Sequence, residues 1–155
     1  MKKPTLILLC AFASLLTGCW EARHHTSRSL AVTFPAPAAQ LNMHLLVNDE
    51  EVQGALKLID GVLTSNGIVG DLKQQSPNER GLIASYAKYD AAGIRLTGAP
   101  DLYLKDGRLT VEFVEIGNRS GHLTAKIQKV FDLLLNELKG RYGANRVSSR
   151  RTDAD

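Results

Sequence analysis

The segment that constrains the fold most is residues 102–113, in which apolar and polar residues alternate on both sides of Asp106-Gly107. This pattern predicts a β-hairpin with a two-residue turn, because Asp-Gly tolerates the positive φ angles that such a turn needs. The loop length fixes the register, which pairs Asp101 with Glu112, Leu102 with Val111, Tyr103 with Thr110, Leu104 with Leu109 and Lys105 with Arg108. One face then carries only apolar side chains and is predicted to be core: Leu102, Leu104, Leu109, Val111 and Phe113.

A first helix is predicted over residues 49–65, where apolar residues recur at helical spacing. Asn48 is the expected N-cap, Glu51 completes a capping box, and Asn66-Gly67 provides a stop. The acidic residues of the first turn are therefore interpreted as a helix start rather than as a metal site.

The longest periodic segment follows the hairpin and predicts a second helix over residues 121–142. Ser120 is its expected N-cap and Gly143 its stop. Its apolar residues form one broad stripe: Leu123, Ile127, Val130, Phe131, Leu134, Leu138 and Tyr142.

The remaining pattern predicts a strand over residues 82–89 and a short return strand over residues 94–96. Together these elements predict a single α+β domain over residues 41–147. Its expected architecture is a two-layer sandwich, in which an antiparallel sheet of about three to five strands packs on two helices. The charged residues 148–155 are expected to form a disordered tail.

The N-terminus has the features of a signal peptide. Lys2 and Lys3 precede an apolar run at residues 6–16, which is shorter than the roughly 20 residues that a membrane-spanning helix needs. We therefore predict a cleaved signal over residues 1–18. Removing 18 of the 155 residues leaves 137, enough for one domain with its own core.

The signal ends in Leu16-Thr17-Gly18-Cys19, which resembles the lipobox of bacterial lipoproteins. The resemblance implies that the sulfur of Cys19 is diacylated before cleavage, so that Cys19 is the lipidation site and anchors a protein that does not span the membrane. A secreted protein with a free cysteine is the alternative. In the enteric sorting rule that accompanies the lipobox, Asp after the cysteine retains a lipoprotein in the inner membrane. Trp20 stands at that position and favours the periplasmic face of the outer membrane.

Residues 19–40 show little helix or strand pattern, and two prolines near the end favour an extended backbone. We interpret this stretch as the lipidated cysteine followed by a flexible tether. The alternation of Leu30, Val32 and Phe34 is the exception, because it is compatible with an edge strand.

The residues that could carry chemistry do not form a known catalytic or metal-binding motif. The serine of Gly117-Asn118-Arg119-Ser120-Gly121 is fourth rather than third, unlike that of a nucleophile elbow. The carboxylates of Asp101 and Glu112 lie at the frayed end of the hairpin and are interpreted as a solvated surface pair. No HxxxH or HExxH spacing links the four histidines, which are interpreted as solvent-exposed: His24, His25, His44 and His122. We therefore predict no catalytic residue, cofactor or metal site.

These observations predict a non-catalytic envelope lipoprotein that acts by contact with an envelope protein partner. The alternative is a binding module for a small molecule or an envelope polymer, with Tyr103, Thr110 and Glu112 on its binding surface. A hydrolase with a dispersed site is the third hypothesis. Lys and Arg are scattered among acidic residues, so a nucleic-acid partner is not expected.

Overall fold

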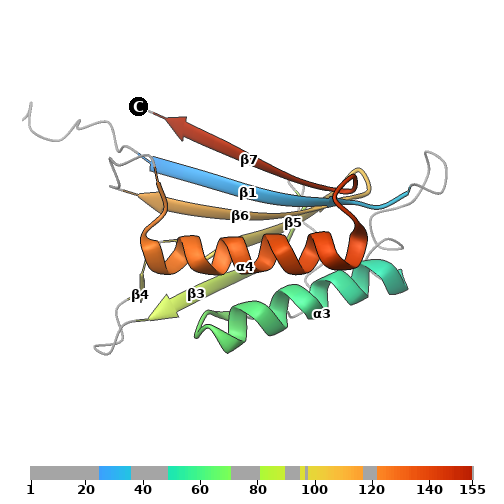
Figure 1. The fold of residues 1–155 in the computed structure, drawn as a ribbon. Helices are drawn as coiled ribbons and strands as arrows, with labels where there is room; N and C mark the ends of the chain where they lie inside the picture. Colours follow the sequence, from blue (N-terminus) through green and yellow to red (C-terminus); the bar gives the residue numbers. More distant parts are fainter. Residues whose placement is uncertain are drawn as a thin grey trace, which may run out of the picture.

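The computed structural model describes residues 25–35, 49–70, 81–89, 95–96, 98–116 and 122–154. Figure 1 shows the fold. In chain order its elements are β1 (His25–Thr33), α3 (Glu50–Ser65), β2 (Val69–Gly70), β3 (Leu82–Tyr89), β4 (Arg95–Leu96), β5 (Asp101–Lys105), β6 (Arg108–Ile116), α4 (Ala125–Tyr142) and β7 (Val147–Ala154).

The strands form one antiparallel sheet in the order β2-β3-β5-β6-β1-β7, and β4 pairs with β3. Both helices lie on the same side of this sheet (Figure 1). The predicted two-layer α+β architecture is confirmed. The sheet has seven strands among the described residues, more than the predicted three to five, because segments near both ends of the chain join it.

The hairpin of β5 and β6 has the predicted register at all five pairs, from Asp101–Glu112 to Lys105–Arg108. Asp106 and Gly107 have φ angles of 51° and 70°, which a two-residue turn of this type requires. The predicted core face is at most 1% exposed at each of its five residues: Leu102, Leu104, Leu109, Val111 and Phe113.

The shorter predicted strands are also present. The strand over residues 82–89 is confirmed as β3. The return strand is confirmed as β4, which pairs with the end of β3, although Ile94 lies outside the described residues.

Helix α3 confirms the predicted helix over residues 49–65, but its capping differs. Asp49 is the N-cap, and its carboxylate accepts a hydrogen bond from the N–H of Glu51 at 2.8 Å. Asn48, the predicted N-cap, lies outside the described residues. The predicted capping box is wrong, because the Glu51 carboxylate binds Arg146 instead.

Helix α4 begins at Ala125, four residues after the predicted start, with Thr124 as its N-cap. The buried carboxylate of Glu115 accepts the backbone N–H of Thr124 at 2.8 Å, and this contact fixes where the helix starts. Ser120 lies outside the described residues. Both helices stop as predicted, at glycines in the left-handed region: Gly67 with φ 72° and Gly143 with φ 86°.

The interpretation of residues 19–40 as a flexible tether is wrong for strand β1. This strand lies between β6 and β7 and pairs with both, so it is an inner strand rather than the edge strand considered above. Leu30 and Val32 are at most 1% exposed. Toward the N-terminus the alternation continues through serine, threonine and arginine, which hide it in the sequence. Pro35 follows the strand, and its missing N–H suits a strand end.

The interpretation of residues 148–155 as a disordered tail is also wrong. These residues form most of β7, which pairs with β1 from Val147 opposite Val32 to Ala154 opposite His25. The buried Val147 fixes the strand on the core, and exposed Arg150 and Arg151 give this edge the charge that is typical of edge strands. Within the described part, the folded domain therefore runs from His25 to Ala154 instead of over residues 41–147.

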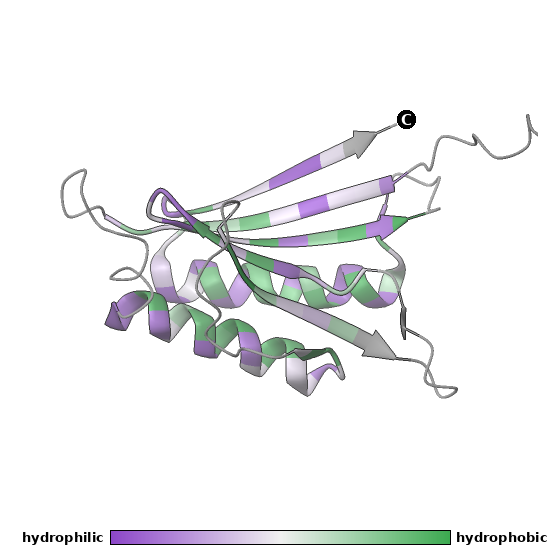
Figure 2. Ribbon diagram, turned by 180° about the vertical axis from the view of Figure 1, so that it is seen from behind, coloured by the Kyte–Doolittle hydropathy of each residue, from purple (hydrophilic) through white to green (hydrophobic). Residues whose placement is uncertain are grey.

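The core lies between the sheet and the helices. Hydrophobic and hydrophilic residues alternate along the strands, as Figure 2 shows from behind. The rings of Phe113 and Phe131 meet edge to face with centroids 5.7 Å apart, and those of Phe34 and Tyr142 do so at 5.9 Å. These contacts connect β6, and the residue that follows β1, to α4.

Candidate functional site

The candidate binding surface is the face of the sheet opposite the helices, which we call the open face. It is defined by the partly exposed side chains that the strands direct away from the core: Ser29, Tyr103, Thr110 and Glu112. Ser27 points to the same side but is only 6% exposed. Neither α3 nor α4 covers it (Figures 1 and 2). The structure therefore brings together the three residues of the predicted binding surface, since Tyr103 pairs with Thr110 and Glu112 follows on the same strand.

The predicted carboxylate pair lies on the open face. Asp101 and Glu112 are opposite one another in the hairpin, and both are half-buried. The Glu112 carboxylate also accepts a hydrogen bond from the Ser27 hydroxyl at 2.9 Å. Glu112 is thus held by a third strand, which the sequence did not predict.

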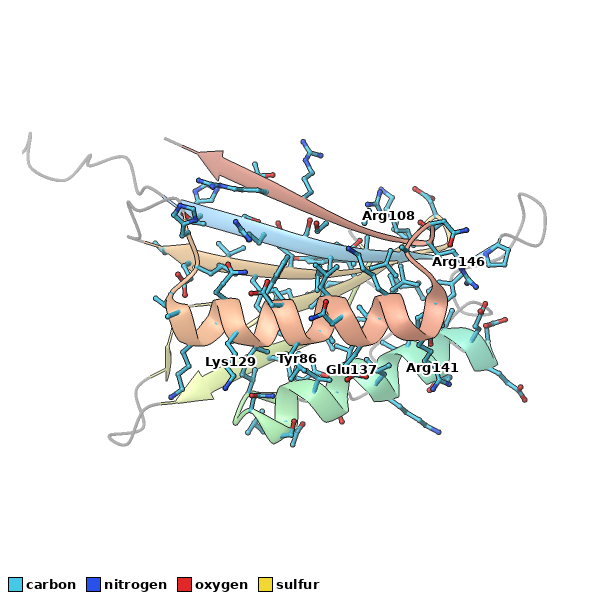
Figure 3. The ribbon with its side chains drawn as sticks, viewed as in Figure 1. Tyr86, Arg108, Lys129, Glu137, Arg141 and Arg146 are labelled. Carbon is cyan, nitrogen blue, oxygen red and sulfur yellow. The ribbon has the colours of Figure 1, made fainter. Side chains whose placement is uncertain are left out.

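Cationic side chains lie toward the hairpin turn and along β7. Lys105 and Arg108 close the hairpin, and the Arg108 guanidinium donates a hydrogen bond to the Ser148 hydroxyl at 2.9 Å. Arg150 is opposite Ser29 on the same face. Figure 3 shows Arg108 at the hairpin end of the sheet.

The open face therefore offers one aromatic ring, several hydroxyl groups and charges of both signs. Hydroxyl and carboxylate groups arranged along extended strands can form hydrogen bonds to a polar partner surface, and tyrosine is enriched at protein interfaces. Among the described residues, no three side chains of His, Cys, Asp or Glu are grouped so that they could hold a metal ion.

A second polar cluster lies on the core side, at the start of α4. Glu115 is only 1% exposed. Its carboxylate accepts the backbone N–H of Thr124 at 2.8 Å and the Thr124 hydroxyl at 2.9 Å. A carboxylate at a helix N-terminus is favoured by the helix dipole, so Glu115 fastens α4 to β6. The sequence signal for this role was a glutamate at a core position of an alternating strand.

A third cluster joins the start of α3 to the start of β7. The Arg146 guanidinium binds both oxygens of Glu51, at 2.8 and 3.0 Å, and lies 5.6 Å from the ring centroids of Phe34 and Tyr142. The hydrogen bond from Arg146 lowers the pKa of the Glu51 carboxyl and raises the pKa of Arg146. Figure 3 places Arg146 beside the end of α4. Since its groups satisfy one another, we assign this cluster a structural role.

A fourth polar contact fastens α3 to β3. Tyr86 is fully buried, and its hydroxyl donates a hydrogen bond to the Asp60 carboxylate at 3.0 Å. Burial and this hydrogen bond raise the pKa of the Tyr86 hydroxyl. The phenol is therefore a neutral donor, not a candidate base.

Of the predicted lipidation site and the four histidines, the structure describes only His25 and His122. Cys19, His24 and His44 lie outside the described residues. His25 begins β1 and is half-buried, so the prediction that it is a solvent-exposed tether residue is wrong. His122 is exposed as predicted and precedes α4 instead of lying in its first turn.

Within the described ranges, neither helix has the length and apolarity that a membrane crossing requires.

Comparisons of the chain with protein-family models, with curated proteins and with solved structures gave no match.

Proposed function

We propose that the protein is a lipid-anchored module of the bacterial envelope that acts without catalysis. In this proposal Cys19 holds it on the periplasmic face of the outer membrane, and the open face binds another envelope protein. The observation that carries the proposal is the position of β1, which starts at His25 and lies inside the sheet. Only residues 20–24 separate Cys19 from this strand, so an acyl group on Cys19 would be attached almost directly to the folded domain.

The short connection sets how far the domain can move from the membrane. Residues 20–24 span at most about 17 Å when fully extended, at about 3.3 Å per residue. A domain held this close to the membrane surface meets partners in the same membrane at a high effective concentration. A weak binding surface then suffices, and the open face carries the hydroxyl, aromatic and charged groups of a polar binding surface.

The anchor is tested by metabolic labelling with a fatty acid that carries an alkyne tag. Cys19→Ala should abolish the label and leave an unprocessed precursor. Cys10→Ala is the matched control, because Cys10 lies inside the predicted signal and its loss should leave labelling unchanged. Undiminished labelling of the Cys19→Ala variant refutes the anchor.

The binding surface is tested by placing a photo-crosslinking amino acid at Thr110 on the open face. Lys57, an exposed residue of α3 on the other side of the molecule, is the control position. We expect a crosslinked protein partner in intact cells from position 110 and none from position 57. Adducts of a glycan or a small molecule at position 110 would favour the alternative binding role, and equal yields at both positions would refute the assignment of the open face.

A further inference from the structure

One end of the domain lies next to the proposed lipid anchor, and we call it the anchor end. It is formed by the start of β1, the ends of β6 and β7, and the start of α4 (Figure 1). His25 at the start of β1 is opposite Ile116 at the end of β6 and Ala154 at the end of β7. The hydrogen bonds of Glu115 to Thr124 bring the start of α4 to the same end.

Helix α4 presents positive charge at the anchor end. Its first turns contain the exposed Lys126 and Lys129 and no acidic residue in the first turn. Figure 3 shows Lys129 at this end of the helix. Cations are unfavourable near the N-terminus of a helix dipole, so helix stability does not account for lysines at these positions.

The sheet adds two arginines that face each other. Arg28 of β1 is opposite Arg151 of β7, and like charges directly opposite each other in a sheet are destabilising. The Arg28 guanidinium lies 5.6 Å from the Phe131 ring centroid, and its Nε is buried without a hydrogen-bond partner among the described residues. Arg150 lies opposite Ser29 in the middle of β1 and belongs to the open face.

The acidic residues near this end accept hydrogen bonds from neutral groups and keep their charge. Glu115 is buried against Thr124, and Asp153 lies opposite Thr26 near the end of β7. Asp132, one turn further along α4, accepts a hydrogen bond from Gln128. Among the side chains whose exposure is described at this end, the exposed charged ones are Lys126, Lys129 and Arg151 against Asp132.

Among the described residues of the anchor end, one large apolar side chain is exposed. Ile116, the last residue of β6, is 53% exposed. Cations around an exposed aliphatic group are typical of surfaces that rest on a membrane, where the cations meet anionic headgroups and the apolar group enters the interface.

We propose that the anchor end docks on anionic phospholipid headgroups and so fixes the orientation of the domain on its membrane. This proposal rests on the proposed acylation of Cys19. A lipid surface is a better candidate than an acidic protein, because residues 20–24 keep this end within about 17 Å of the acyl chains. The attraction of cations to an anionic leaflet acts within about a Debye length, near 8 Å at physiological ionic strength.

The test uses the full acylated protein, reconstituted in vesicles after mass spectrometry has verified the acyl group. Cys10 would leave with the signal and Cys19 would be blocked, so a single added cysteine can carry a fluorophore. Ala125→Cys labels the anchor end, and Ala144→Cys labels the opposite end; both positions are exposed. Quenching by a nitroxide on the lipid headgroup then reports which end lies on the bilayer.

We expect strong quenching at position 125 and weak quenching at position 144 in vesicles of phosphatidylglycerol and phosphatidylethanolamine. The difference should shrink in phosphatidylcholine vesicles and at about 1 M salt, where the Debye length is near 3 Å. Lys126→Glu with Lys129→Glu should lower the ratio of docked to undocked protein by about tenfold or more, since each cation near an anionic surface contributes roughly fivefold. Lys57→Glu with Lys139→Glu makes the same charge change at exposed positions away from the anchor end and should leave the ratio unchanged.

The outcomes separate the two proposals. Absence of the acyl group on Cys19 overturns the anchor and, with it, the docking. An acylated protein whose quenching does not depend on phosphatidylglycerol or salt overturns the docking alone. Crosslinking of the anchor end to an acidic protein instead of lipid would also overturn it.

Discussion

Replacing Leu30 by alanine tests whether β1 belongs to the folded core. Leu30 is fully buried and lies opposite Val111 of β6. The substitution removes several buried carbon atoms and leaves a cavity between the sheet and the helices. We expect a loss of about 3 kcal/mol or more in the free energy of unfolding, because both the transfer term and the cavity term apply at a site without solvent access.

Urea unfolding of a chain that begins at Trp20 measures this loss. With an m value of roughly 1.5 kcal/mol per molar urea, the midpoint should fall by about 2 M while m stays constant. Leu133→Ala is the matched control, because Leu133 is 40% exposed on α4. Its effect should stay within about 0.5 kcal/mol, as is usual at surface positions.

The result that would refute the reasoning is a midpoint for Leu30→Ala equal to that of the parent chain or of Leu133→Ala. Residues 25–33 would then contribute nothing to stability, and the interpretation as a tether would be restored. A lowered midpoint for Leu30→Ala alone supports β1 as an inner strand of the domain in solution.

Four further substitutions follow from local structure. Gly81→Ala should destabilise the domain by about 1 to 3 kcal/mol, because Gly81 has φ 82° and an added Cβ would lie 2.6 Å from the Leu104 carbonyl oxygen. Gly61→Ala should instead stabilise the domain by about 0.5 to 1 kcal/mol in the same urea assay, because a Cβ at this position of α3 would meet open space. Glu51→Gln should flatten the dependence of the unfolding free energy on pH. The lowered pKa of Glu51 gives stability that is present above the ordinary pKa of 4.5 and is lost as the pH falls through the pKa of the folded state. The substitution should cost less than about 1 kcal/mol, because the pair with Arg146 is exposed, and Glu50→Gln is the control. Glu115→Ala should leave the Thr124 N–H without its acceptor, cost about 1 to 3 kcal/mol, and speed hydrogen exchange at the start of α4.

The sequence predicted best the features that depend on neighbours in the chain. The register of β5 and β6 follows from the Asp106-Gly107 turn and from the alternation around it, and every pair was correct. The helix stops at Gly67 and Gly143 likewise depend on local backbone conformation. The predicted start of α4 was wrong, because it depends on a contact with another element. Glu115 of β6, nine residues before Thr124, accepts the Thr124 N–H.

The strands β1 and β7 could not be predicted in the same way. Their pairing partners are distant: Leu30 pairs with Val111 of β6 and with Ser149 of β7. The polar residues between the core positions of β1 face the open side of the sheet, where Ser and Thr are tolerated, so its hydrophobic pattern is diluted. Among the residues of β7 whose burial is described (147–152), Val147 is the single buried hydrophobic residue, and the strand gains its structure by pairing with β1.

The candidate site was predicted only in part. Tyr103, Thr110 and Glu112 share a face because of the hairpin register, which the sequence determines. The contact of Glu112 with Ser27 and the facing pair of Arg28 and Arg151 both depend on β1. The error about β1 therefore concealed the third strand of the open face and the contribution of Arg28 to the anchor end.

The direction of the strands connects the two proposals. Strand β6 runs over nine residues, from the hairpin turn at Arg108 to the anchor end at Ile116, which is about 30 Å at 3.3 Å per residue. With the anchor end on the headgroups, the strands would point away from the bilayer, and the open face would lie roughly perpendicular to the membrane plane. A partner in the same membrane would then approach Thr110 without lifting the domain from the surface. Docking by charge would in this way supply the orientation that a short acylated linker alone leaves undefined, and the proposed binding residues and the proposed membrane-facing cations would occupy different parts of one small domain.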